Sequence, residues 1–318
     1  MADGGLKVSD KVADKGPKQE QEQEQKQGRL RLGAHLSISA GPDKAAELAG
    51  RIGANTFQFF TRNPRGGARR TISAEEASRW GLVRREKDLS PIVGHLPYTV
   101  NLAAPKPELH KFAIDVLAED LRRMKEIGAE FLAVHPGSHA GAGPEAGIER
   151  IVEAIARAFD GLVGGPTLLL ETMAGQGSEI GGRLEEIGAI IARLGDPPGV
   201  GVCLDSCHLF AAGHDVRTPA GVDRLVEELA GTVGLPRVRA VHLNDSKMPL
   251  GSRRDRHELI GKGQIGQDGI RAFVENEFIK TLPLILETPV ADYQEYGDEI
   301  RAVLEIIGWG RGNRAGGG

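Results

Sequence analysis

The stretch GVCLDSCHLFAAGHD, residues 201–215, begins as a buried strand and then changes character. Its apolar run ends in a carboxylate, Asp205, and an imidazole, His208, follows three residues later. A core strand gains no stability from such an ending, because burying an unpaired charge is costly. Other apolar runs of the chain end in the same way, each on a residue type that binds metals.

Eight short β-rich runs alternate with longer helical patterns, and this alternation predicts the fold. Strands that alternate with helices favour parallel pairing, and eight such units predict a closed barrel. We therefore expect an α/β fold, a single (β/α)8 TIM barrel over residues 29–310. The runs are LRLGAHLS (30–37), TFQFFT (56–61), PIVGHL (91–96), FLAVHPG (131–137), TLLLET (167–172), GVCLDS (201–206), RAVHLND (239–245) and PLILETP (283–289).

The two ends of the chain differ in composition from the middle. Residues 1–28, which include KQEQEQEQKQ (18–27), have almost no apolar side chains with which to form a core. They predict a disordered N-terminal tail, with a solvated helix as the alternative. Residues 311–318 predict a flexible C-terminal tail for the same reason. Helix starts are predicted inside the domain by SAEE (73–76) and DYQE (292–295), which read as capping boxes.

Composition limits the classes of partner. The 318 residues carry a net charge of −4, so general attraction to nucleic acid or anionic membrane is excluded and any basic surface must be local. No stretch is long and apolar enough to predict a membrane span or a signal segment. The only cysteines are Cys203 and Cys207, which fits a reducing, cytoplasmic location.

Six consecutive strands predicted from residue 91 onward end on ligand-type side chains. The terminal residues are His95, His135, Glu171, Asp205, His242 and Glu287. Two residues earlier, on the same face of each strand, are Val93, Ala133, Leu169, Cys203, Ala240 and Ile285. One inward-facing row therefore changes from core filler to ligand chemistry at the end of the barrel where such folds place active sites.

A single polar residue at a strand end is more often a hydrogen-bonded structural group, but six together are hard to explain in that way. Without cations, they would leave unpaired charge in one crowded barrel mouth. Histidine and carboxylate are ligands that zinc accepts. Three further candidates, His208, Asp255 and His257, predict a second cluster with coordination room for substrate. Asp205 would then serve one ion and His208 another.

Long blocks of the sequence resemble the endonuclease IV family of zinc-dependent abasic-site endonucleases, also called deoxyribonuclease IV. The blocks include HLPYTVNLAAP (95–105), VHPGSH (134–139), LLLETMAGQGSEIG (168–181), GVCLDSCHLFAAGHDVRTP (201–219) and VHLNDSKMPLGSRRDRHELIGKGQIG (241–266). The resemblance implies a TIM barrel that hydrolyses the DNA phosphodiester 5′ to an abasic site in base excision repair. It implies 3′-hydroxyl and 5′-deoxyribose phosphate ends, and 3′-phosphodiesterase activity on blocked ends.

The same resemblance implies how nine ligands hold three Zn²⁺ ions. His95, His135 and a bridging Glu171 would hold the first ion. Glu171, Asp205, His242 and Glu287 would hold the second, and His208, Asp255 and His257 the third. Glu171 and Glu287 are the residues that we expect to be catalytic.

DNA contacts are expected from loops on the same face as the metals. Basic residues follow two strands, in RNPRGGARR (62–70) and in SKMPLGSRRDRH (246–257), and we expect Arg65, Arg253 and Arg254 to bind DNA. By resemblance, Tyr98 and Arg65 enter the duplex at the lesion and hold the flipped-out sugar. Thr99 follows Tyr98 where many relatives carry a bulky apolar residue, which predicts a weaker wedge.

Two other functions compete with this interpretation. A sugar isomerase or epimerase of the same barrel superfamily would need only Glu171, Asp205, His242 and Glu287, whereas a non-catalytic lesion-binding protein would not need a complete ligand set.

The predicted partner is double-stranded DNA with abasic sites, bound by a monomer without a nucleotide cofactor. His35, His139 and Asn244 are candidate supports for the ligands, and Cys203 is expected to fill the core.

Overall fold

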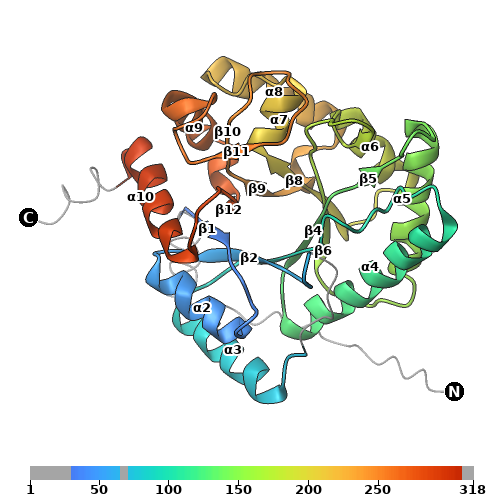
Figure 1. The fold of residues 1–318 in the computed structure, drawn as a ribbon, viewed down its shortest axis with the longest axis horizontal. Helices are drawn as coiled ribbons and strands as arrows, with labels where there is room; N and C mark the ends of the chain where they lie inside the picture. The colour runs from blue at the N-terminus through green and yellow to red at the C-terminus, as the bar shows by residue number, and fades with distance from the viewer. Residues whose placement is uncertain (1–29, 65–70, 310–318) are drawn as a thin grey trace, which may run out of the picture. The chain divides into compact units, whose positions relative to one another are not determined.

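Eight parallel strands close into a barrel in the order β1-β12-β9-β8-β6-β4-β3-β2. They form because each apolar run is buried, mostly on both faces, as a barrel wall covered by helices requires. All eight predicted strands are present in the computed structural model, at the centre of Figure 1. Their bounds are β1 Leu32–His35, β2 Thr56–Phe60, β3 Ile92–His95, β4 Phe131–Val134, β6 Thr167–Glu171, β8 Val200–Asp205, β9 Val238–His242 and β12 Leu284–Leu286.

The barrel interior confirms the period-two pattern of the strands. The six predicted core fillers form one buried cluster together with Phe131. Cys203 belongs to this cluster and has no exposed surface, so it packs as expected. Side chains alternate along a strand, so the residue two positions after each core filler also faces the barrel interior. It lies one layer nearer the carboxyl end of the barrel.

Helices form a ring outside the strands (Figure 1). Ser73 and Glu76 form the predicted capping box at the start of α3. The second predicted box is wrong: Asp292 accepts from the Gln294 N–H and begins the 3₁₀ turn η3, Tyr293–Glu295, not an α-helix. The helices are α2 Pro42–Arg51, α3 Ala74–Glu86, α4 Pro107–Ile127, α5 Pro144–Ala158, α6 Leu184–Arg193, α7 Ser206–Ala212, α8 Pro219–Thr232, α9 Gly266–Glu275 and α10 Tyr296–Ile306, with 3₁₀ turns η1 Leu235–Arg237 and η2 Ile279–Thr281.

Two small antiparallel strand pairs, which the sequence analysis did not predict, order the loops that follow barrel strands. One pairs β5, Gly137–Ser138, with β7, Glu179–Ile180, and the other pairs β10, Asp245–Ser246, with β11, His257–Glu258. The second pair is a hairpin in the loop that contains Asp255 and His257, so it gives that loop a defined course.

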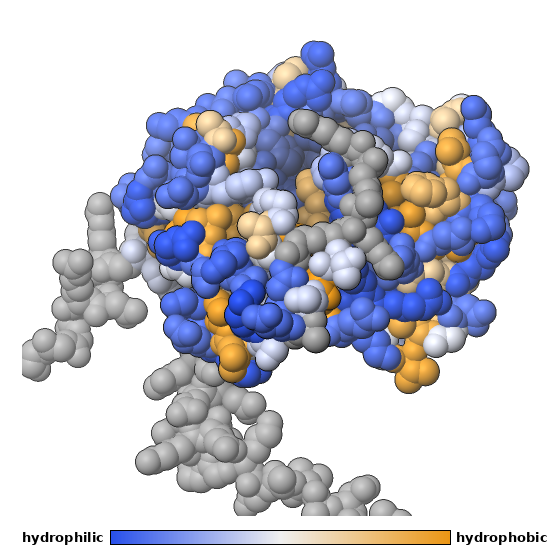
Figure 2. Space-filling view, turned by 60° about the horizontal axis from the view of Figure 1, so that its bottom comes forward, coloured by the Kyte–Doolittle hydropathy of each residue, from blue (hydrophilic) through white to orange (hydrophobic). Residues whose placement is uncertain are grey.

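The structure describes residues 30–64 and 71–309, and the predicted tails at 1–28 and 311–318 lie outside these ranges. All elements belong to the unit that begins at Arg31. Hydrophilic residues predominate on the face of the molecule in Figure 2. None of the helices in the described ranges combines the length and the apolar character needed to cross a bilayer.

Candidate metal centre

The six strand-end side chains meet at the carboxyl end of the barrel. His95, Glu171, Asp205 and His242 are the last residues of β3, β6, β8 and β9, and each is at most 3% exposed. His135 and Glu287 follow the last residues of β4 and β12 by one position. Asp205 and His242 are also register partners across β8 and β9, so the barrel wall itself places them side by side.

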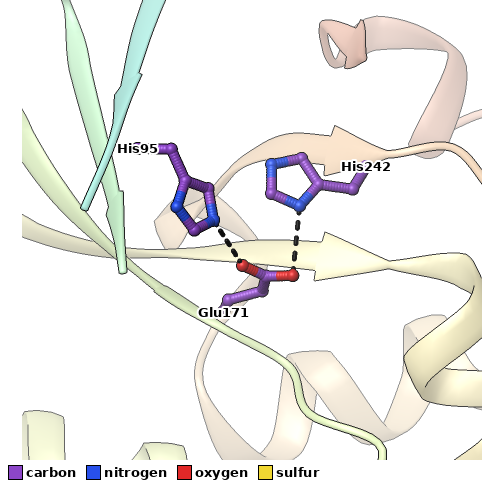
Figure 3. A group of neighbouring side chains, drawn as sticks. All are labelled: His95, Glu171 and His242. Atoms are coloured by element: carbon purple, nitrogen blue, oxygen red, sulfur yellow. Dashed lines mark hydrogen bonds and ion pairs between the residues drawn. The ribbon is translucent and has the colours of Figure 1, made fainter. Parts of the chain in front are cut away.

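Glu171 is the centre of the group. Its Oε2 atom lies 3.1 Å from His95 Nε2 and 3.3 Å from His135 Nε2. Its Oε1 atom lies 3.1 Å from His242 Nδ1 and 3.3 Å from His208 Nδ1. Figure 3 shows the carboxylate between His95 and His242, with one oxygen toward each ring. One carboxylate with imidazoles on both oxygens has the arrangement of a bridging ligand.

A second group surrounds His242 Nδ1. The donor atoms of Glu171, Asp205, His242 and Glu287 all lie within 4.8 Å of one another. His242 Nδ1 is 3.3 Å from Glu287 Oε2 and 4.0 Å from Asp205 Oδ2. Three carboxylates and one imidazole are thus close enough for one cation to touch them all.

The turn after Asp205 produces the third group. Asp205 is the N-cap of α7, and its Oδ1 accepts a hydrogen bond of 2.8 Å from the His208 N–H. This cap starts a helix directly at the strand end, which carries His208 back over the barrel mouth. There His208 joins Asp255 and His257, with donor atoms within 4.8 Å of one another.

Backbone carbonyls orient three of the histidines. The Nδ1–H groups of His95, His208 and His257 are placed to donate to the carbonyls of Leu96, Thr172 and Glu287, at 2.7, 2.9 and 3.1 Å. This leaves each Nε2 as a lone-pair donor that faces the carboxylates. A fixed tautomer of this kind is typical of metal-binding histidines.

Electrostatics and unsatisfied atoms both fit a cation. Burial alone would lower the pKa values of His208 and His257, but Asp205 and Asp255 more than offset it, and the pKa of His257 rises to about 9. The Nε2 atoms of His208 and His257 are buried and make no hydrogen bond to the described residues. Divalent cations would replace the protons as countercharge and use these nitrogens, so the donor set fits zinc.

Three supporting side chains hold the ligands from behind. Asn244 donates to Asp205 Oδ2 at 2.7 Å and accepts from the Glu287 N–H at 2.9 Å, and His35 Nδ1 lies 2.9 Å from Glu287 Oε1. Sequence reasoning missed Gln58, which contacts both His242 and Glu287; its signal was an amide within the apolar run TFQFF. His139 was also a candidate support, but its Nδ1 accepts from the Gly143 N–H at the start of α5 instead.

A cavity of about 470 Å³ opens over the ligands. His95, His135, His208 and Glu287 form part of its lining, together with the ring of Tyr98. Tyr98 is 56% exposed and lies with Thr99 in a turn closed by the Val100 N–H and the Pro97 carbonyl. Tyr98 therefore faces the cavity instead of being covered by the barrel.

The basic residues differ in their surroundings. Arg253 and Arg254 are exposed in the loop that carries Asp255, and no ion pair to either is found among the described residues. Arg62, by contrast, pairs with Asp120 at 2.6 Å and with Glu119 at 3.0 Å, so it anchors the chain after β2. Arg65 lies outside the described residues.

Asp245 closes the loop that supplies the third group. Its buried carboxylate accepts hydrogen bonds from the N–H groups of Ser246, Gly263 and Ile265 at 2.7, 2.9 and 2.9 Å. The two ends of the loop are therefore held by one side chain. Sequence reasoning did not select Asp245, because an Asp in a loop carries no distinctive signal.

Asp245→Asn should loosen this loop. An amide nitrogen would face backbone N–H groups, and hydrogen bonds to a charged group contribute about 1.5–3 kcal/mol each. We expect the free energy of unfolding to fall by about 3 kcal/mol, as measured with urea, and trypsin to cut between residues 247 and 262 faster. Asp268→Asn is the control, because that side chain is 96% exposed; equal tryptic rates in the two variants would contradict the role of Asp245.

Comparisons with known proteins identify the family of the chain. The family model described as "Xylose isomerase-like TIM barrel" matches residues 46–311. The chain is 54% identical to "Probable endonuclease 4" of Moorella thermoacetica, over 87% of this chain and 99% of that one. It is 48% identical to the protein of the same name from Heliobacterium modesticaldum, over 87% and 100%.

Solved structures share the fold of this chain. Endonuclease IV from Thermus thermophilus superposes with a TM-score of 0.76 at 36% identity, covering 86% of this chain and 99% of that one. A D-tagatose 3-epimerase-like protein superposes with a TM-score of 0.64 at 19% identity, over 88% and 98%, and shares the fold alone. With its barrel complete and relatives this similar over nearly their whole length, the chain belongs to the endonuclease IV family.

Proposed function

We propose that this protein is a zinc-dependent hydrolase that cuts DNA on the 5′ side of an abasic site. The observation that carries the proposal is the convergence of nine ligand-type side chains at one barrel mouth, in a member of the endonuclease IV family. The products would be a 3′-hydroxyl and a 5′-deoxyribose phosphate, and the same site would remove 3′-blocking groups. The reaction belongs to base excision repair.

Three zinc ions are the proposed cofactors. His95, His135 and Glu171 would hold one ion, and Glu171, Asp205, His242 and Glu287 another; His208, Asp255 and His257 would hold the third. Bound zinc would lower the pKa of water toward 7 and stabilise negative charge on a phosphodiester. Four carboxylates do not neutralise the charge of three divalent cations when the histidines are neutral, so the loaded site would attract the anionic backbone.

Protein side chains would position the DNA. Arg65, Arg253 and Arg254 are the proposed phosphate contacts, and such contacts place a duplex without reading its sequence. Tyr98, with Thr99 beside it at the tip of the turn, is the proposed residue against the extruded sugar. Extrusion costs least where a base is missing, which gives selectivity for abasic sites.

The number of ligands disfavours a sugar isomerase. Glu171, Asp205, His242 and Glu287 would satisfy that chemistry. The remaining five candidates, His95, His135, His208, Asp255 and His257, would then be buried or half-buried without a function.

The proposal further includes a monomeric protein in the cytoplasm.

The test is incubation of the protein with a duplex that carries one abasic site. We expect a single cut, and analysis of the termini should give a 3′-hydroxyl on the 5′ side of the lesion. A cut on the 3′ side, or no cut by zinc-loaded protein, would overturn the proposed function.

Tyr98→Ala should reduce discrimination between abasic and intact duplexes. A ring inserted at the lesion can stack on a neighbouring base, which contributes about 1–3 kcal/mol, so the ratio of the two affinities, measured by fluorescence anisotropy, should fall by at least about fivefold. Tyr98→Phe retains the ring and is the control. Zinc content should stay unchanged in both variants, and equal discrimination in Tyr98→Ala and wild type would assign Tyr98 to packing.

A further inference from the structure

Gln58 is a polar side chain in a fully buried part of the barrel wall. It lies at the middle of β2, between Phe57 and Phe59, and has no exposed surface. A buried amide is costly unless both its oxygen and its nitrogen find partners. The partners of Gln58 therefore indicate why the strand contains it.

Both ends of the Gln58 amide contact candidate metal ligands. Its Oε1 atom lies 2.8 Å from His242 Nε2, and its Nε2 atom donates to Glu287 Oε1 at 2.7 Å. His242 and Glu287 come from adjacent strands, β9 and β12, on the other side of β1. One side chain thus joins two ligands of the second group.

His242 differs from three other ligand histidines in what orients it. His95, His208 and His257 are held at Nδ1 by backbone carbonyls. His242 instead points Nδ1 at Glu171 and Glu287, and its Nε2 faces a side-chain amide oxygen. An amide oxygen only accepts, so it fixes the proton on Nε2 and leaves the Nδ1 lone pair toward the carboxylates.

Gln58 also determines which oxygen of Glu287 faces the site. Glu287 Oε1 accepts from Gln58 and lies 2.9 Å from His35 Nδ1. Its Oε2 atom is left toward His242 Nδ1, at 3.3 Å. The carboxylate is therefore held with one oxygen engaged by the protein and one available to a cation.

We propose that Gln58 is a positioning residue for the second metal, because its amide fixes the tautomer of His242 and the orientation of Glu287. This inference rests on the proposed zinc site. Removing a partner that orients a metal ligand typically costs 10- to 100-fold in metal affinity. The loss should concern one ion, since Gln58 contacts ligands of the second group and not those of the third.

Gln58→Leu tests the proposal in zinc-loaded protein. We expect one of three zinc ions to bind about 10- to 100-fold more weakly in a chelator competition, and the hydrogen-bonded Nε2 proton of His242 to shift in the NMR spectrum. Gln58→Glu keeps an acceptor for His242, and its ionised carboxylate cannot donate to Glu287, so His242 should retain its Nε2 proton while zinc affinity still falls.

Thr56→Val is the matched control on the same strand. It removes the partly buried hydrogen bond from Thr56 Oγ1 to the Pro91 carbonyl, which involves no candidate ligand. Gln58→Leu with wild-type zinc affinity, or with no greater loss than Thr56→Val, would overturn the inference and leave the zinc site intact. Wild-type protein that binds no zinc would overturn the zinc site itself.

Discussion

Glu171→Gln should abolish DNA cleavage and reduce the zinc content from three ions to about one. Oε2 of Glu171 lies near His95 and His135 of the first group and Oε1 near His242 of the second, so the carboxylate would serve two of the three proposed ions. An amide removes the negative charge and turns N–H donors toward ring nitrogens that must themselves bind a cation. His208, Asp255 and His257 would remain as a group.

The expected loss of rate follows from the role of the cations. Metal ions contribute several kcal/mol of charge stabilisation in the transition state, and about 5 kcal/mol corresponds to roughly 10⁴-fold at 1.36 kcal/mol per tenfold. We expect kcat on an abasic duplex to fall by at least that factor, with elemental analysis reporting the lost zinc. Full zinc content together with full activity would remove the bridging role of Glu171.

A matched carboxylate at the opposite end of the barrel provides the control. Glu130 lies immediately before β4, where it accepts from the Ile92 N–H at 2.8 Å and pairs with Arg84. Glu130→Gln also removes one negative charge. Glu130 precedes β4, however, whereas the ligands lie at the carboxyl ends of the strands. We expect it to lower stability while kcat and zinc content stay near their wild-type values.

The sequence alone predicted the barrel because its signal is local and repeated. Each strand is a short apolar run, and period two identifies which side chains face inward, from Val93 and Leu169 in the core to His95 and Glu171 at the rim. Closure of the barrel then brings residues from different strands together without any information about loops. The spacing of residues along each strand therefore predicts the inward-facing row of ligand-type side chains.

What the sequence did not predict depends on loops and on side-chain partners. The approach of His257 to Asp255 and His208 requires the hairpin of β10 and β11 and the contacts of Asp245. These are long-range hydrogen bonds with no periodic signature. Gln58 was missed for a related reason, since glutamine is not a metal-ligand type and its role appears only from its distances to His242 and Glu287.

Removal of the metal by chelation should lower thermal stability and should separate the competing functions. Zinc present at 1,000 times its Kd stabilises the folded state by about 4.1 kcal/mol for each site. Because 1 kcal/mol shifts Tm by about 2–4 °C in proteins of 150–250 residues, we expect Tm to fall by at least about 10 °C on metal removal. Cleavage should cease at the same time, and calorimetry with activity assays would follow both.

The number of zinc equivalents that restores Tm and cleavage distinguishes the two functions. Glu171 and Asp205 are fully buried, and the Nε2 atoms of His208 and His257 have no hydrogen-bond partner among the described residues, so we expect cations in more than one group. Zinc should therefore restore Tm and cleavage at about three equivalents, and magnesium should fail because it prefers oxygen ligands in octahedral geometry. Recovery complete at one equivalent would instead favour the isomerase, since five of the nine candidate ligands would then bind no ion.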